Sequence, residues 1–349
     1  MPETIHAMIF HATACQTAIE CCFDAAGTFL PQRVVANQAS ASEVIREASR
    51  RTGSQLFVLP QFSLHGFSMG RTSADWVNAA TRIPGPETEH FGELARELNI
   101  WIAGTLCEVL DEFPGRYFLT GFIVAPSSEV VLRYRKLYAF STKTRPGDVL
   151  TRYLGLFGRE ALFPVVRTPL GRLAMAIAGD VNWPEMTRSL ALRGAEIILN
   201  PTAQALMPAD RDTGMPCVRR VRAFENLCYV ILANAGPLTG AGPMPEARLR
   251  SEIVDYQGRV LATADTDSAT TVTAAIDIEA LRRERALPMK NFLAQLQPEL
   301  HAADYATARL WPADGWLGAP QQDPMELFRM EQRVWQQMVA SGGFEAAQR

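Results

Sequence analysis

The sequence predicts an α/β fold in which helices cover β-sheets. Short apolar runs typical of buried strands alternate with helical segments of about ten residues, and no repeat, low-complexity tract or flexible linker divides the chain. Of the 349 residues, 48% are apolar, which is ample for a large core. We therefore expect one α/β domain over residues 1–290, followed by a distinct C-terminal extension over residues 291–349.

The first predicted element is a helix. Ser40 and Glu43 match a capping box, so we expect a helix from Ser40 to about Arg51, with Gly53 as its stop signal. A short apolar strand follows, and the alternation then repeats. In order, the elements expected next are strand 56–60, helix 90–98, strand 101–107 and the paired strands 119–126 and 129–134.

The second half continues the same alternation. The expected elements are strand 173–178, helix 184–193, strand 196–200, helix 219–227 and strand 228–234, and strands 252–260 and 270–276 look like a closing pair. In the extension, Asp323, Pro324 and Glu326 predict the start of a terminal helix. Such a helix packs either on its own domain or on a second copy of the chain. Its apolar face carries Leu327, Met330, Val334 and Met338.

Composition excludes several classes of function. The formal net charge of −3 leaves no surplus of positive charge for a nucleic-acid groove, and the apolar runs are too short to span a membrane. No secretory signal is visible, and six cysteines in so long a chain do not form a disulfide scaffold, so we expect a cytoplasmic protein with reduced thiols. No zinc spacing and no glycine-rich phosphate loop occur, so neither a metal nor another cofactor is expected.

Four segments carry a more specific signal. Residues 59–67, 133–140, 176–201 and 222–234 closely resemble the motifs of the nitrilase superfamily, the carbon–nitrogen hydrolases. The third segment is most similar to the aliphatic-amidase and formamidase-like branch, and residues 291–305 resemble the C-terminal part of that group. The resemblance implies a four-layer α-β-β-α sandwich. It also implies a homodimer or larger homo-oligomer, with the C-terminal helix as a candidate contact.

Superfamily members use a Glu–Lys–Cys triad. The glutamate takes the thiol proton, the thiolate attacks the amide or nitrile carbon, and the lysine stabilises the developing charge. By resemblance, the lysine is present here as Lys136, but the base position holds Gln61 and the nucleophile position holds Ala178. A glutamine cannot accept the proton and an alanine has no nucleophilic atom. Because losing the nucleophile alone costs on the order of 10⁶ in turnover, we expect no hydrolysis by the family route.

Other positions also match the family or depart from it. Glu108 matches a second glutamate that supports the lysine and helps position substrate. Gly179 replaces the aromatic residue usual after the nucleophile, which leaves more room, and Asp180 fixes the register of the motif. Asn182 and Trp183 stand where family members contact substrate, although both also suit an ordinary helix start. The resemblance therefore implies ligand binding at residues 179, 180, 182 and 183.

The stretch 133–172 is unusually basic, with nine basic residues against Asp148 and Glu160. This local charge could draw an anionic ligand towards the site, or it could form a solvated face. The basic residues are Arg133, Arg135, Lys136, Lys143, Arg145, Arg152, Arg159, Arg167 and Arg172.

Three functional hypotheses follow. The protein is a natural degenerate member that binds a small amide- or carboxylate-like ligand, or an active family partner. Alternatively, it is a repurposed enzyme that uses Lys136, Glu108 and Asp180 for acid–base chemistry such as a condensation, cyclisation or elimination. Thirdly, Gln61 and Ala178 are the residues of a substrate-trapping variant, although Phe118 and Gly179 also depart from the family pattern and no trapping design needs them. Cys217 as a substitute nucleophile is less typical than Cys217 as a packing residue.

Overall fold

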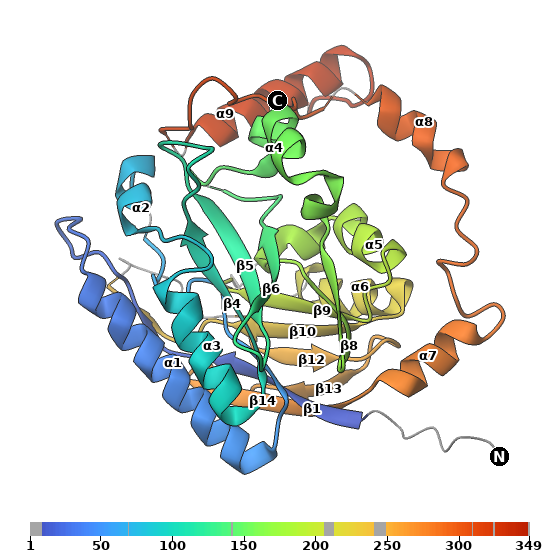
Figure 1. Cartoon of the computed structure of the whole chain (residues 1–349). Helices are drawn as coiled ribbons and strands as arrows, with labels where there is room; N and C mark the ends of the chain where they lie inside the picture. Colours follow the sequence, from blue (N-terminus) through green and yellow to red (C-terminus); the bar gives the residue numbers. More distant parts are fainter. Residues whose placement is uncertain are drawn as a thin grey trace.

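The computed structural model describes residues 9–68, 70–140, 142–205, 213–240, 249–308, 310–323 and 325–347. Two six-stranded sheets pack face to face, and helices cover the outer face of each (Figure 1). This arrangement confirms the four-layer α-β-β-α sandwich implied by the sequence resemblance.

The first sheet has the strand order β14-β1-β3-β4-β5-β6. Strand β3 runs parallel to β1 and β4, whereas β14, β5 and β6 each join an antiparallel neighbour. The strands are β1 (Ile9–Gln16), β3 (Leu56–Val58), β4 (Trp101–Glu108), β5 (Phe118–Val124), β6 (Val130–Arg135) and β14 (Thr270–Asp277). The helices on its outer face are α1 (Pro31–Thr52), α2 (Ser73–Ala79) and α3 (Pro86–Leu98).

The second sheet has the order β13-β12-β10-β9-β8-β7, and its central strands β8, β9 and β10 are parallel. Its strands are β7 (Val165–Thr168), β8 (Gly171–Met175), β9 (Ile197–Thr202), β10 (Tyr229–Asn234), β12 (Glu252–Val254) and β13 (Val260–Thr263). Helices α5 (Pro184–Leu192) and α6 (Val218–Asn226) cover its outer face. Strands β2 (Ile19–Glu20) and β11 (Leu238–Thr239) form a small separate pair.

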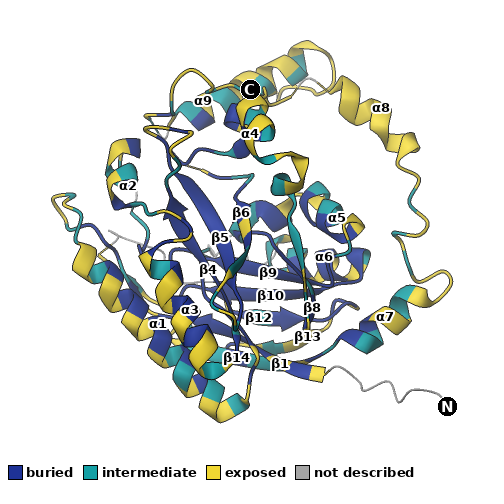
Figure 2. Ribbon diagram, in the orientation of Figure 1, coloured by how far each residue is buried: buried dark blue, intermediate teal, exposed yellow. Residues whose placement is uncertain are grey.

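The core lies between the sheets and under the helices. Val58 of the first sheet and Leu199 and Val230 of the second belong to one buried cluster, and all three are fully buried. Figure 2 shows the central strands as almost uniformly buried ribbons. Because these strands are covered on both sides, they appear in the sequence as continuous apolar runs, which is why most of them could be predicted.

Helix α1 begins at Pro31, well before the predicted start at Ser40, so the capping-box interpretation was wrong. Ser40 is an exposed residue in the middle of the helix. The earlier turns bury polar side chains, above all Asn37, whose amide donates to two backbone carbonyls at 2.7 and 2.8 Å. These buried amides interrupt the apolar pattern and conceal the first turns. Gly53 ends the helix with φ 63°, as predicted.

The predicted closing pair of strands was also wrong. Residues 252–260 contain β12 and the start of β13, which pair with each other in the second sheet. Strand β14 instead pairs with β1 in the first sheet. The apolar pattern identifies the strands, but it does not specify their partners across the sandwich.

The C-terminal segment runs from α7 (Ile278–Ala286) around the sandwich through α8 (Glu299–Thr307) to α9 (Met325–Ala340) (Figure 1). Of the predicted apolar face of α9, Leu327 is buried, whereas Met330, Val334 and Met338 are half-buried. The predicted start at Pro324 lies outside the described residues. Among the described residues, no helix is both long enough and apolar enough to cross a membrane.

Candidate functional site

The three positions predicted from the triad follow strands that end on one side of the sandwich. Gln61 follows β3, Lys136 follows β6 and Ala178 follows β8. Two hydrogen bonds tie these ends together across the sheets. The backbone N–H of Gln61 donates to the Thr202 carbonyl at 3.2 Å, and the Lys136 ammonium donates to the Ile177 carbonyl. The structure therefore brings the strand ends that carry these positions together.

Lys136 is a buried ammonium with a carboxylate beside it. Its side chain is 7% exposed, and Nζ lies 3.6 Å from Oδ1 of Asp180. Burial lowers the pKa of Lys136, and the negative charge of Asp180 opposes that shift. The ammonium is thus held at the carboxyl end of β8, at the carbonyl of the residue before Ala178.

Asp180 shapes the turn that follows β8. Its carboxylate accepts hydrogen bonds from the Tyr134 hydroxyl at 2.8 Å, the Tyr138 N–H at 3.0 Å and the Ile177 N–H at 2.9 Å. Burial raises the pKa of Asp180, whereas Lys136 and these donors lower it. These contacts place Asp180 where it positions Lys136 and the turn.

Ala178 opens a 3-10 turn (Ala178–Asn182) in a backbone conformation that is unfavourable for a residue with a side chain. Its φ is 47°, in the left-handed region that normally favours glycine. Asn200 holds the strained segment by donating to the Ala176 and Ala178 carbonyls at 2.5 and 3.1 Å. Backbone strain maintained by neighbouring hydrogen bonds is typical of functional sites. Gly179 follows and is half-buried.

The other two predicted ligand-binding residues lie at the exposed rim. Asn182 is exposed, and its carbonyl accepts a hydrogen bond from Arg222 at 3.0 Å. The Trp183 indole stacks on the Tyr138 ring, with 4.1 Å between centroids and an interplanar angle of 4°. This pair joins the turn after β8 to the loop after β6.

Glu108 has partners other than those expected. Its carboxylate binds Arg135 through two hydrogen bonds of 2.8 and 2.9 Å and accepts a third from Thr120 at 2.6 Å. The sequence resemblance implied that it supports Lys136, but the carboxylate paired with Lys136 is Asp180. The difference follows from side-chain alternation, because Arg135 and Lys136 are adjacent residues and point to opposite sides.

Lys143 is a buried lysine that the sequence analysis recorded only as part of the basic stretch. It is 5% exposed, and its Nζ lies 5.2 Å from the centre of the Phe62 ring and 5.7 Å from that of Phe67. Burial is the main reason why the pKa of Lys143 falls to about 8; Cys107 opposes this shift and the nearby charge of Lys136 adds to it. One sequence signal could have identified it: lysine occurs at only three positions among the 34 basic residues.

None of the six cysteines stands at the predicted nucleophile position, 178. All six are free, and five of them, Cys15, Cys21, Cys22, Cys107 and Cys228, are buried. Cys217 is exposed on the short turn before α6. The part of the chain that the structure describes contains no cluster of three or more side chains suited to hold a metal ion.

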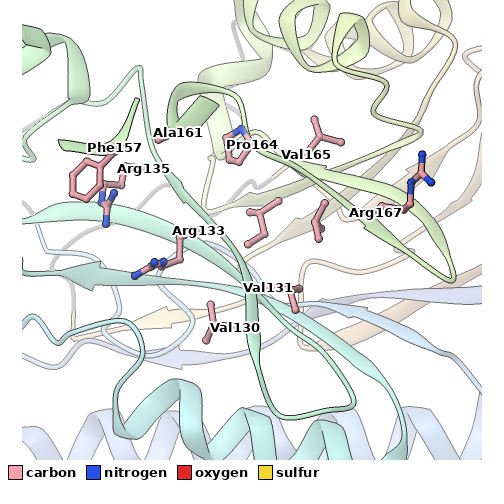
Figure 3. Close-up of a pocket in the computed structure, with 11 residues that line it drawn as sticks. Val130, Val131, Arg133, Arg135, Phe157, Ala161, Pro164, Val165 and Arg167 are labelled. Carbon is pink, nitrogen blue, oxygen red and sulfur yellow. The ribbon is translucent and has the colours of Figure 1, made fainter. Parts of the chain in front are cut away.

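A separate cleft of about 470 Å³ lies between the edge strands of the two sheets (Figure 3). Val131 and Arg133 of β6 line one part of it, and Val165 and Arg167 of β7 line another. It contains none of the predicted site residues. Its one connection to them is Arg135, which lines the cleft and also binds Glu108.

Comparisons with known proteins agree with this architecture. The carbon-nitrogen hydrolase family model matches residues 12–286. The hydrolase in the pqqF 5′ region of Pseudomonas protegens is 30% identical over 278 residues, covering 78% of this chain and 87% of that protein. Omega-amidase NIT2 of Bos taurus is 27% identical over 249 residues, covering 71% of this chain and 86% of the relative.

Solved structures show the same fold. An amidase from Nesterenkonia sp. AN1, a double mutant with glutamate changed to glutamine and cysteine to alanine in complex with acrylamide, matches with a TM-score of 0.61 and 21% identity. The match covers 85% of this chain and 98% of that one. Nit3 of Saccharomyces cerevisiae matches with a TM-score of 0.62 and 19% identity, covering 81% and 96%. From the family match over most of its length, the chain belongs to the carbon-nitrogen hydrolase family.

Proposed function

We propose that this protein binds a small amide- or carboxylate-like ligand beside Lys136 and does not hydrolyse C–N bonds through a covalent intermediate. The observation that carries the proposal is Ala178. Ala178 occupies the strained start of the turn after β8, directly after Ile177, whose carbonyl accepts a hydrogen bond from the Lys136 ammonium. Its side chain is only a methyl group. Gln61, at the base position, has no basic oxygen to take a proton.

Two observations favour retained binding. Buried groups position Lys136 and the turn: Tyr134 and Lys136 contact Asp180, and Asn200 donates to the carbonyls of Ala176 and Ala178. In addition, the Nesterenkonia amidase with glutamine for glutamate and alanine for cysteine holds acrylamide. That relative supports the view that a member of this fold with these two residue types still takes a ligand.

The alternative is a repurposed acid–base enzyme that uses Lys136, Glu108 and Asp180. Its two carboxylates are fully engaged: Glu108 by Arg135 and Thr120, and Asp180 by Lys136, Tyr134 and two backbone N–H groups. A general acid or base needs an oxygen within reach of substrate. These contacts favour binding over acid–base catalysis.

An ammonia-release assay on a panel of small aliphatic amides tests the absence of hydrolysis. We expect no turnover by the wild-type protein, and we expect Gln61→Glu/Ala178→Cys to raise turnover at least about 100-fold because it returns both the base and the nucleophile. Ala178→Cys alone is the matched control and should gain less. Hydrolysis by the wild-type protein would contradict the proposal.

Thermal shift and calorimetric titration with the same amides and the corresponding acids test binding. Lys136→Met should remove the ligand-induced rise in Tm, whereas Lys290→Met should leave it unchanged. Lys290 is the third lysine and lies at the surface, 3.9 Å from Glu284. Ligand stabilisation that survives Lys136→Met would place binding elsewhere on the protein.

We also propose that the C-terminal extension, residues 291–349, packs against a second copy of the chain. Helix α9 buries Leu327, yet it leaves Phe328 46% and Trp335 45% exposed. Exposed aromatic residues on one helix are typical of a protein interface. Light scattering should give a dimer or larger assembly that Phe328→Ser/Trp335→Ser weakens. A monomeric wild-type protein at micromolar concentration would refute this part.

A further inference from the structure

Within the described ranges, no carboxylate forms an ion pair with the Lys143 ammonium. The ammonium donates a hydrogen bond to the Phe140 carbonyl at 3.4 Å and lies over the faces of the Phe62 and Phe67 rings. None of the ion pairs among the described residues includes Lys143. A buried cation without a carboxylate is costly, so a protein that retains one has a use for it.

The choice of lysine at this position is itself informative. Only three of the 34 basic residues are lysines, and two of them, Lys136 and Lys143, are buried in this part of the molecule. The third, Lys290, lies at the surface, and all the other basic residues are arginines, even in buried ion pairs such as Arg135 with Glu108. Lysine differs from arginine in being a compact point charge with three rotatable donors. Of the two buried lysines, Lys136 pairs with Asp180, whereas Lys143 has no such partner among the described residues.

The surroundings place Lys143 beside the proposed ligand site. Phe62, whose ring lies under the Lys143 ammonium, directly follows Gln61 in sequence. Lys136 is close enough for its charge to act on Lys143. Since Gln61 is neutral, Asp180 is the one carboxylate beside these two ammonium groups in the described structure, and Lys136 already engages it. No described carboxylate is therefore left to pair with Lys143, and the buried Arg219 guanidinium adds further positive charge near Lys136.

We propose that Lys143 binds the carboxylate of a small organic acid together with Lys136, so that the ligand itself supplies the missing negative charge. This inference rests on the proposed ligand site. It narrows the class of ligand, which was either an amide or a carboxylic acid, to a carboxylic acid. A carboxylate has the planar shape of a primary amide and differs from it mainly in charge. Gln61, which is neutral, and Lys143, which is positive, both favour binding of the carboxylate over the amide.

The test compares acids with their own amides on the full-length protein. Calorimetric titrations would use C3–C6 monocarboxylates, C4–C6 dicarboxylates and the corresponding amides at pH 7. We expect at least one acid to bind at least about 10-fold more tightly than its amide, as a charge-assisted contact would provide. Lys143→Met should reduce acid affinity by about 10-fold or more and leave amide affinity within about 2-fold. Lys290→Met is the matched control and should change neither.

A second measurement, NMR of labelled lysine, uses the wild-type protein and does not depend on whether a variant folds. With ¹³C-labelled lysine, the protein gives three Cε-methylene signals, and acid binding should shift those of Lys136 and Lys143 but not that of Lys290. Lys143→Gln provides a second variant with a neutral side chain if Lys143→Met does not fold. A purely structural role for Lys143 would change stability without changing the ratio of acid to amide affinity.

The outcomes separate the two proposals. Amides that bind as well as acids, or a preference for acids that survives Lys143→Met and Lys143→Gln, would overturn the carboxylate inference and leave the proposed ligand site intact. Binding of inorganic phosphate more tightly than any acid would overturn it in favour of a different anion. Failure of both acids and amides to bind would reject the proposed ligand site, and this inference with it.

Discussion

The Arg135 guanidinium binds both carboxylate oxygens of Glu108, with Nε–Oε2 and Nη2–Oε1 distances of 2.8 and 2.9 Å. The two side chains are 6% and 0% exposed, and the guanidinium also lies 4.4 Å from the centre of the Phe157 ring. The pair joins the ends of β4 and β6 immediately before Lys136. It therefore fixes the direction from which Lys136 enters the site.

Glu108→Gln should lower the free energy of unfolding by about 3–5 kcal/mol, because it leaves the Arg135 charge buried and unpaired. Glu108→Gln/Arg135→Met should recover part of that loss, since no charge is then buried. Urea denaturation measures both. Asp111→Asn, which breaks the exposed pair with Arg82, is the control and should cost less than about 1 kcal/mol. Equal effects of the buried and exposed changes would refute this account.

Lys136→Met should also destabilise the protein, by about 3 kcal/mol, because Asp180 is fully buried and loses its cation. Asp180→Asn in the same background removes the remaining charge. The two changes should therefore be less costly together than the sum of each alone, with a coupling of at least about 1 kcal/mol in a double-mutant cycle. Strict additivity would show that the two groups do not interact.

Lys143 should make stability depend on pH. Burial lowers its pKa to about 8 in the folded protein, whereas in the unfolded chain it stays near about 10.4. Between these values the unfolded state holds the extra proton, so the contribution of Lys143 to stability rises with pH. Lys143→Met should thus stabilise the ligand-free protein most at pH 7 and least at pH 10.

Urea denaturation of wild type and Lys143→Met at pH 7, 8.5 and 10 measures this difference. Subtracting the free energy of unfolding of the wild type from that of Lys143→Met at each pH removes the contribution of other titrating groups. Two groups act on Lys143 from neighbouring segments: Lys136, which has the same charge, and Cys107, whose pKa burial raises to about 12. A difference that is constant over this range would show that Lys143 keeps its ordinary pKa.

Trp183→Ala should weaken ligand binding about 10-fold with little loss of stability. The indole is 36% exposed, so its stacking on Tyr138 contributes only about 1 kcal/mol, but it forms the rim beside the turn that carries Ala178. Titration and thermal unfolding separate the two effects. Phe140→Ala removes another aromatic side chain, 67% exposed in the same loop as Tyr138, and should not affect binding. Equal losses for both variants would deny Trp183 a specific role.

Much of the fold could be predicted from the sequence because the central strands are buried on both faces. Leu199 and Val230 lie in runs that are apolar at nearly every position, and such runs are easily identified. Strand pairing could not be predicted in the same way. Whether β14 pairs with β1 or with β13 depends on packing between segments far apart in the chain.

The site was only partly predictable, for a similar reason. Gln61, Lys136 and Ala178 lie in motifs whose spacing survives in sequence, so their positions could be assigned. The partner of Glu108 depends on which way two adjacent side chains point, and Lys143 is revealed by its contact with Phe62, a residue far away in the chain. Such contacts have no local pattern in the sequence.

The route of the C-terminal segment has a consequence for how the protein is made. Asp314 accepts hydrogen bonds from the backbone and hydroxyl of Thr151 at 2.9 and 2.6 Å, and Trp311 and Trp316 cover the guanidinium of Arg145. The loop that follows Lys143 is thus held by residues translated more than a hundred codons later. A nascent chain cannot make this contact until residues 311–316 have left the ribosome, so the site acquires this support well after the loop itself has been synthesised.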